Sequence, residues 1–84
     1  HLYKIIAMTC DKQSIQEEFG ITIKRLRDSA GLSQEALGQV SNFDRTYISG
    51  IERGARNPSL VTIIRLAQAL NCPPSDFFQR EDNK

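Results

Sequence analysis

The chain has 84 residues, of which 39% are hydrophobic and 25% are charged, and its formal net charge is +1. This length suits one small domain and excludes an enzyme built from two domains. The hydrophobic fraction is sufficient for a modest core, which excludes a chain that is disordered along most of its length. The small net charge by itself gives little support to a nucleic-acid partner and decides nothing alone.

The basic side chains are concentrated in the middle of the chain. Residues 24–65 carry seven lysines and arginines against four acidic residues, a local charge of +3, whereas each flank carries −1. We therefore expect an anionic partner to be attracted to this central region.

The sequence lacks the signals of membrane, secreted and metal-binding proteins. No apolar run approaches the about 18–20 residues of a membrane span, and the start lacks the order of a signal peptide. Cys10 and Cys72 form no Cys-x-x-Cys pair, and His1 is the only histidine. This spacing fits neither a zinc site nor a disulfide framework. We predict reduced thiols, a cytoplasmic location, and no cofactor, metal or small-molecule ligand.

The predicted organisation is an N-terminal extension (1–13), one domain (14–80) and a polar tail (81–84). Residues 1–7 are either native or derived from an expression vector, because the chain opens with His1 and Met8 stands after this segment.

The first predicted helix begins near Ile15. Ser14 and Glu17 have the spacing of a capping box, in which a hydroxyl and a carboxylate satisfy free amides at a helix start. Gly31 is predicted to end the helix, and Gly20 weakens its first part by about 1 kcal/mol relative to alanine. The apolar stripe that should face the core is Ile15, Phe19, Ile23, Leu26 and Ala30. Most of the opposite face is predicted to be Lys24, Arg25, Arg27 and Asp28.

A short second helix is predicted over residues 34–41. Ser33 can cap its start, and Leu37 and Val40 are expected to face the core. Asn42 tolerates the positive φ of a tight turn.

Asp44 can cap a third helix that ends near Glu52 or Arg53. Ile48 and Ile51 are three positions apart, so they should point inward together. The residues left outside are Arg45, Thr46, Ser49 and Gly50, with Tyr47 at the boundary.

A fourth helix, capped by Ser59, has the strongest amphipathic pattern of the chain. Its apolar positions are Leu60, Ile63, Ile64, Ala67 and Leu70. Asn71 and the following prolines should end it, and residues 74–79 predict a short fifth helix that carries Phe77 and Phe78. Outside residues 2–8 no segment alternates with the period of a strand, so the predicted fold class is all-α with five helices.

The second and third helices, joined by a tight turn, match a helix-turn-helix arrangement. The stretch from Leu32 to Gly54, LSQEALGQVSNFDRTYISGIERG, resembles the Cro/cI-type (XRE) family of bacterial and phage regulators. Residues 58–78 look like helices four and five of the same domain. The resemblance implies a five-helix, lambda-repressor-like DNA-binding domain with the helix-turn-helix at helices 2 and 3. One departure is Gly38, where alanine is more usual.

Residues 44–57 resemble most closely the controller proteins of restriction–modification systems, which are dimeric. Free-standing repressors and fused regulators contain a similar sequence segment. The resemblance is therefore also compatible with a phage-type repressor or an antitoxin.

The hydrogen-bonding groups that bases expose in the DNA major groove indicate which side chains can contact them. Arg45 presents a planar fork that can donate two hydrogen bonds to guanine O6 and N7, and Thr46 and Ser49 can reach base edges from the same helix. An alternative for Arg45 is a solvated side chain paired with Asp44 or Glu52. We expect Glu52 to pair internally, with Arg25 or another basic residue, because phosphates would repel it.

Other residues are candidates for the DNA backbone. The resemblance places Gln34 at a phosphate, and basic or polar side chains that follow the third helix can add contacts. The candidate set is Gln34, Tyr47, Arg53, Arg56 and Asn57. Tyr47 is equally well explained by packing over the turn, and charges on the first helix are more simply a solvated face.

No catalytic arrangement is predicted, because the chain has a single histidine and its neighbouring carboxylates diverge on a helix. One helix-turn-helix reads about four or five base pairs, so we predict a homodimer whose recognition helices lie about 34 Å apart on a pseudo-palindromic operator. Apolar candidates for the dimer interface are Phe78, Leu60, Ile64 and Leu66, with Phe77 in the core. The alternative is an all-α protein-interaction adaptor, which the small net charge favours.

Overall fold

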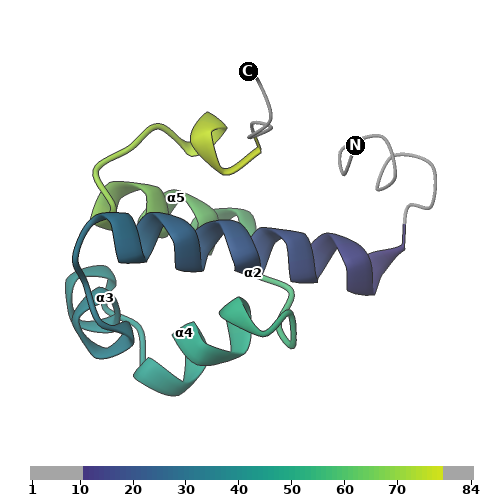
Figure 1. The fold of residues 1–84 in the computed structure, drawn as a ribbon, viewed down its shortest axis with the longest axis horizontal. Helices are drawn as coiled ribbons and strands as arrows, with labels where there is room; N and C mark the ends of the chain where they lie inside the picture. Colours follow the sequence, from purple (N-terminus) through teal and green to yellow (C-terminus); the bar gives the residue numbers. More distant parts are fainter. Residues whose placement is uncertain (1–10, 79–84) are drawn as a thin grey trace.

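The computed structural model describes residues 11–78, and this part of the chain folds into four α-helices and one 3-10 helix, without strands. The elements are α2 (Lys12–Ser29), α3 (Gln34–Ser41), α4 (Arg45–Glu52), α5 (Leu60–Ala69) and η1 (Pro74–Phe78). The long helix α2 crosses the molecule, with α3 and α4 below it and η1 above it in Figure 1. The all-α class is confirmed for these residues. Predictions about Cys10, the segment 1–7 and the polar tail fall outside them.

The predicted fifth helix is the short 3-10 helix η1, so the described residues contain four α-helices and the predicted count of five is not confirmed. The segment has only five residues and begins with Pro74, whose ring nitrogen has no hydrogen to donate. Such short pieces favour the tighter 3-10 hydrogen-bond pattern. Phe77 is buried as predicted, while Phe78 is 61% exposed.

Helix α2 begins about one turn earlier than predicted. Asp11 is its N-cap, and the Asp11 carboxylate accepts hydrogen bonds from the Ser14 amide at 2.9 Å and from the Ser14 hydroxyl at 3.0 Å. Ser14 therefore lies inside the first turn, and Glu17 accepts from the Gln13 side chain at 2.9 Å rather than closing a capping box. Ile15 is 44% exposed, so the apolar stripe begins only at Phe19.

One contiguous core lies between the helices. Its buried hydrophobic members are Phe19, Ile23, Leu37, Ile48, Ile51, Leu66, Ala67 and Phe77. Leu66 is fully buried, so its assignment to a dimer interface is wrong. Val40 was expected in the core but is 60% exposed. It lies in the last turn of α3, on the edge of a shallow pocket beside α5, where nothing described covers it.

The predicted caps and turns of the other helices are confirmed. Ser33, Asp44 and Ser59 are the N-caps of α3, α4 and α5. Asn42 adopts the left-handed conformation with φ 64°, and Gly31 follows α2 with φ 75°. These positions depend on residues a few places apart, which explains why sequence patterns located them.

Gly20 marks the place where α2 crosses the end of α4. A Cβ atom at this position would lie 2.6 Å from the Glu52 carbonyl oxygen and closer still to the Ile51 carbonyl oxygen. Gly38 is similar, since a Cβ there would lie 2.6 Å from the Phe43 carbonyl oxygen. The two glycines are required for close backbone packing, which outweighs their poor helix propensity.

Gly20→Ala is expected to lower the free energy of unfolding by about 1–3 kcal/mol, even though alanine is the better helix former. The added methyl group meets backbone carbonyls that cannot rotate away. Urea denaturation of the variant against wild type measures the change. Ile21→Ala, at an exposed position of the same helix, is the control and should change stability by less than about 0.5 kcal/mol. Equal stability of Gly20→Ala and wild type would contradict the close approach.

Candidate nucleic-acid interface

A tight turn joins α3 to α4. Asn42 reverses the chain in the left-handed conformation, and the Phe43 amide donates to the Gly38 carbonyl at 2.8 Å. The Asp44 carboxylate then accepts hydrogen bonds from the Thr46 amide at 2.9 Å and from the Thr46 hydroxyl. Helix α4 thus starts directly after the turn, at the lower edge of the molecule in Figure 1.

The hydrogen bonds from the Thr46 hydroxyl and amide hold the pKa of Asp44 below its usual value, and the charge of Arg45 adds to this effect. The cap therefore remains ionised at neutral pH. Because the Thr46 hydroxyl hydrogen is used by the cap, its oxygen can act only as an acceptor toward a base, and its methyl group stays free.

The first turn of α4 exposes the two leading candidates for base contact. Arg45 and Thr46 are both exposed. Arg45 has no ion pair with Asp44 or Glu52 within residues 11–78, so the alternative of a paired Arg45 is not what the structure contains. Ser49 lies one turn further, is half-buried, and accepts a hydrogen bond from Arg53 Nε at 3.4 Å. Within the described residues, the guanidinium of Arg45 is therefore exposed and makes no ion pair.

The backbone of α4 is fixed by a buried ion pair. Arg27 Nε and Glu52 Oε2 lie 2.6 Å apart, and Arg27 Nη2 donates to Glu52 Oε1 at 3.1 Å. Arg27 Nη1 donates to the Leu32 carbonyl at 2.7 Å, and Gln34 Nε2 donates to Glu52 Oε1 at 2.9 Å. The hydrogen bond and charge of Glu52 outweigh burial and raise the pKa of Arg27. One network therefore joins α2, α3 and α4.

This network confirms one prediction and corrects another. Glu52 pairs internally with a basic residue as predicted, and that residue is Arg27. Arg27 was expected on the solvated face and is only 7% exposed. It continues the four-residue spacing of Phe19 and Ile23, which was the signal for its burial, whereas Arg25 lies about 200° away around the helix.

The candidates for backbone contact are not all equally free. Gln34 directs its amide nitrogen at Glu52, which leaves it a single side-chain hydrogen for another acceptor. Arg53 and Asn57 are exposed. Arg56 lies with its guanidinium carbon 5.3 Å from the centre of the Tyr47 ring.

Gly50 was predicted to lie open on the outer face, but it is buried. A Cβ atom there would lie 2.9 Å from Cγ of Arg56, so the Arg56 side chain covers this position. Tyr47 is half-buried, and its hydroxyl lies 3.5 Å from that of Thr62. The sequence allowed two roles for Tyr47, a phosphate contact or packing over the turn. The half-buried side chain agrees with packing.

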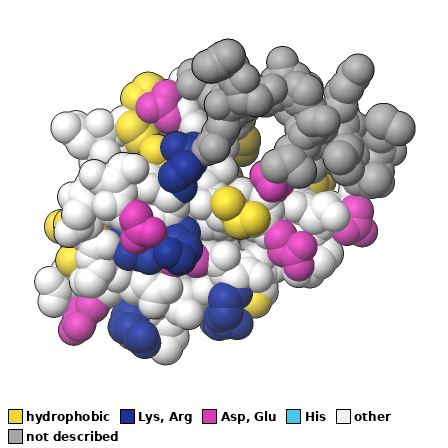
Figure 2. All heavy atoms as spheres, in the orientation of Figure 1, with side chains coloured by type: hydrophobic (Ala, Val, Ile, Leu, Met, Phe, Trp, Pro, Cys, Tyr) yellow, Lys and Arg dark blue, Asp and Glu magenta, His cyan; other side chains and the backbone are white. Residues whose placement is uncertain are grey.

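Lysine and arginine side chains on the face shown in Figure 2 lie over the part of the molecule that contains α2 and α4, with acidic side chains between them. The surface is therefore of mixed charge, in keeping with the local excess of +3 for residues 24–65 in a chain of net charge +1. Within the described residues no group of three or more His, Cys, Asp or Glu side chains could hold a metal ion. None of the described helices is both long and apolar enough to cross a membrane.

The positions of these helices agree with a known family. Residues 23–77 match the family model HTH_3, described as helix-turn-helix. The chain belongs to this helix-turn-helix family. The XRE-type resemblance of the sequence is thereby confirmed.

Individual members of the helix-turn-helix family are also similar to the chain. It is 39% identical over 70 residues to the control protein C.SmaI of Serratia marcescens, covering 83% of either protein. The crystal structure of the restriction–modification controller protein C.AhdI from Aeromonas hydrophila superposes with a TM-score of 0.76 at 46% identity, over 77% of this chain and 98% of that one. The C.Esp1396I tetramer, solved with its natural 35 base-pair operator, gives a TM-score of 0.70 at 38% identity, over 75% of this chain and 83% of that one.

Sequence patterns missed two side chains that shape this surface. The Phe43 ring lies against the Tyr47 ring with ring centres 5.1 Å apart and ring planes tilted by 51°, and Arg65 of α5 lies over the Phe43 ring at 4.2 Å. Arg65 is the only charged residue in the otherwise largely apolar helix Leu60–Ala69. A single charged residue in an apolar helix indicates that its side chain has a specific partner, and this could have been used to predict the role of Arg65.

Proposed function

We propose that the chain is a transcriptional regulator, not an enzyme, that binds double-stranded DNA sequence-specifically in the cytoplasm. In this proposal α3 and α4 form the helix-turn-helix, and α4 enters the major groove. One observation supports it above the others. Helix α4 exposes Arg45 and Thr46 at its start while Ile48 and Ile51 on its other face are buried, so a rigid helix presents the Arg45 donors and the Thr46 acceptor outward.

The roles of the side chains follow from their chemistry and exposure. Arg45 reads a guanine through its two parallel donors, and Thr46 and Ser49 contact neighbouring base edges. The DNA backbone is bound by the residues around this helix, which are Gln34, Tyr47, Arg53, Arg56 and Asn57. The contacts to the DNA backbone fix the position of α4 on the duplex, and the base contacts determine which DNA sequence is bound.

A homodimer is part of the proposal because one small helix-turn-helix offers too few contacts for tight binding at cellular salt. Leu60, Ile64 and Phe78 are exposed apolar side chains on α5 and η1, two elements that pack against each other. They are suited to an interface between two copies. Similarity to a restriction–modification controller and to a controller that forms an operator-bound tetramer supports assembly of this kind and the more specific role of a restriction–modification controller.

Selection of bound sequences from a random duplex library at about 150 mM salt tests the function. We expect enrichment of a two-fold symmetric site, with half-sites about one helical turn apart and affinity well above that for random DNA. Sedimentation of the protein alone and with the selected duplex checks for two copies per site. Weak binding that depends steeply on salt, with no enriched site, would contradict the proposal and favour a protein-interaction adaptor.

A further inference from the structure

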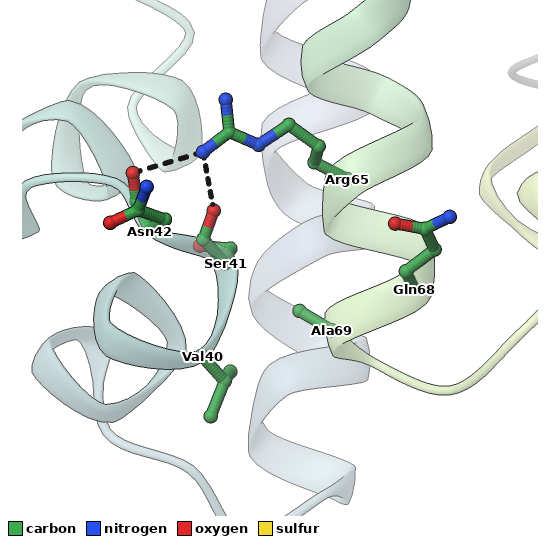
Figure 3. Close-up of a pocket in the computed structure, with 6 residues that line it drawn as sticks. All are labelled: Val40, Ser41, Asn42, Arg65, Gln68 and Ala69. Atoms are coloured by element: carbon green, nitrogen blue, oxygen red, sulfur yellow. Dashed lines mark hydrogen bonds between the residues drawn. The ribbon is translucent and has the colours of Figure 1, made fainter.

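Arg65 reaches from α5 to the end of α3, beside a shallow pocket of about 390 Å³ lined by both helices (Figure 3). Its Nη2 atom donates to the carbonyl oxygens of Ser41 at 2.9 Å and Asn42 at 3.1 Å. Carbonyls at the C-terminus of a helix lack partners within the helix. A side chain of α5 therefore caps the helix that precedes the turn.

The Arg65 guanidinium also begins a series of ring contacts. Its Cζ atom lies 4.2 Å from the centre of the Phe43 ring, and the Phe43 and Tyr47 ring centres are 5.1 Å apart. The Arg56 guanidinium carbon lies 5.3 Å from the centre of the Tyr47 ring. Contacts between a cation and an aromatic face, and between tilted rings, are attractive. The contact series of Arg65, Phe43, Tyr47 and Arg56 thus joins α5, the turn, α4 and the loop after α4.

The contact series links α4 to α5, a helix that is not its main packing partner. Helix α4 packs chiefly against α2 and α3. Tyr47 adds a second link to α5, because its hydroxyl lies 3.5 Å from the hydroxyl of the buried Thr62. An additional attachment on another side of a short helix limits rotation of the helix about its own axis. The direction in which Arg45 leaves α4 depends on that rotation.

We propose that Arg65 is a positioning residue that orients α4, and with it Arg45 and Arg56, for DNA recognition without contacting a base. This inference rests on the proposed function. It assigns to α5 a role in sequence discrimination, because a base contact requires its donors in a defined direction.

Three variants of the full chain separate geometry from charge. Arg65→Met keeps an unbranched apolar stem and removes the charge and the hydrogen-bond donors. Arg65→Lys keeps the charge and removes the planar guanidinium fork. Gln68→Ala changes an exposed residue that lines the same pocket as the half-buried Arg65, and it is the matched control. Thermal unfolding checks that each variant is folded at the temperature of the binding assay.

The decisive measurement is the ratio of affinity for the selected duplex to affinity for random duplex. Both Arg65 variants are expected to lower this ratio by about tenfold, comparable to the loss of one base contact. Arg65→Lys should retain wild-type affinity for random DNA, and Gln68→Ala should retain the ratio. Full recovery of the ratio by lysine would overturn the proposal in favour of simple charge attraction. A lower melting temperature with an unchanged ratio would overturn it in favour of a purely structural role.

A second readout does not depend on DNA. In amide and aromatic NMR spectra of the free protein, both Arg65 variants should shift the Tyr47 ring signals and the Arg45 and Thr46 amides, and Gln68→Ala should leave them in place. If wild type itself does not distinguish the selected duplex, the proposed function fails while these spectra still decide the positioning role. Unshifted α4 signals in both Arg65 variants would refute that role.

Discussion

Replacing Arg27 with alanine is expected to lower the free energy of unfolding by about 3–5 kcal/mol. The Arg27 and Glu52 side chains are 9% and 4% exposed, so the substitution leaves a carboxylate in the interior with the Gln34 amide as its remaining side-chain partner. Loss of the bond to the Leu32 carbonyl adds to the effect. Urea denaturation at neutral pH measures the change.

Two controls separate burial from charge. Lys24→Ala removes a cation from the same helix, but Lys24 and its partner Asp28 are more than half exposed, so little measurable change is expected. The double variant Arg27→Met with Glu52→Leu should recover much of the loss, because no charge is then left buried. If Arg27→Ala were as stable as Lys24→Ala, the ion pair would not be what fixes α4.

Replacing Arg45 with alanine is expected to reduce discrimination between the selected and random duplexes by about 1–3 kcal/mol for each guanine contact, and by twice that for a dimer on two half-sites. The Arg45 side chain is exposed and makes no ion pair within the described residues, so the fold should be unaffected. Titration of both duplexes at the same salt concentration gives the change.

Arg45→Lys is the stricter variant, because it keeps the charge and loses the fork. It should keep affinity for random DNA and lose most of the discrimination. Lys24→Ala removes one positive charge away from α4 and should preserve the ratio. Equal loss on both duplexes in Arg45→Ala would instead assign Arg45 to the DNA backbone.

The helix-turn-helix resemblance was visible in the sequence because its signals are local. Asn42 and the cap Asp44 lie within a few residues of the backbone groups they affect, and the spacing of Ile48 and Ile51 defines an inward face on a short helix. The exposure of Arg45 follows from the same spacing. Most of the candidate contact surface could therefore be listed before its geometry was known.

Less of the first helix could be predicted. Ser14 and Asp11 are both good caps, and local chemistry does not decide between them when a helix can extend by one turn. Val40 has the right spacing for a core residue, but burial depends on whether another helix covers that side. Periodicity identifies a face of a helix and says nothing about how far the covering element extends.

The sequence by itself determined the all-α class, the N-caps Ser33, Asp44 and Ser59, and the left-handed turn at Asn42, since each of these rests on interactions across only a few residues. The tertiary structure alone decided which arginine meets Glu52, why Gly20 is glycine, and what Arg65 does. Their partners lie 20 or more positions away along the chain and are brought close only by helix packing. A local pattern carries no information about those distances.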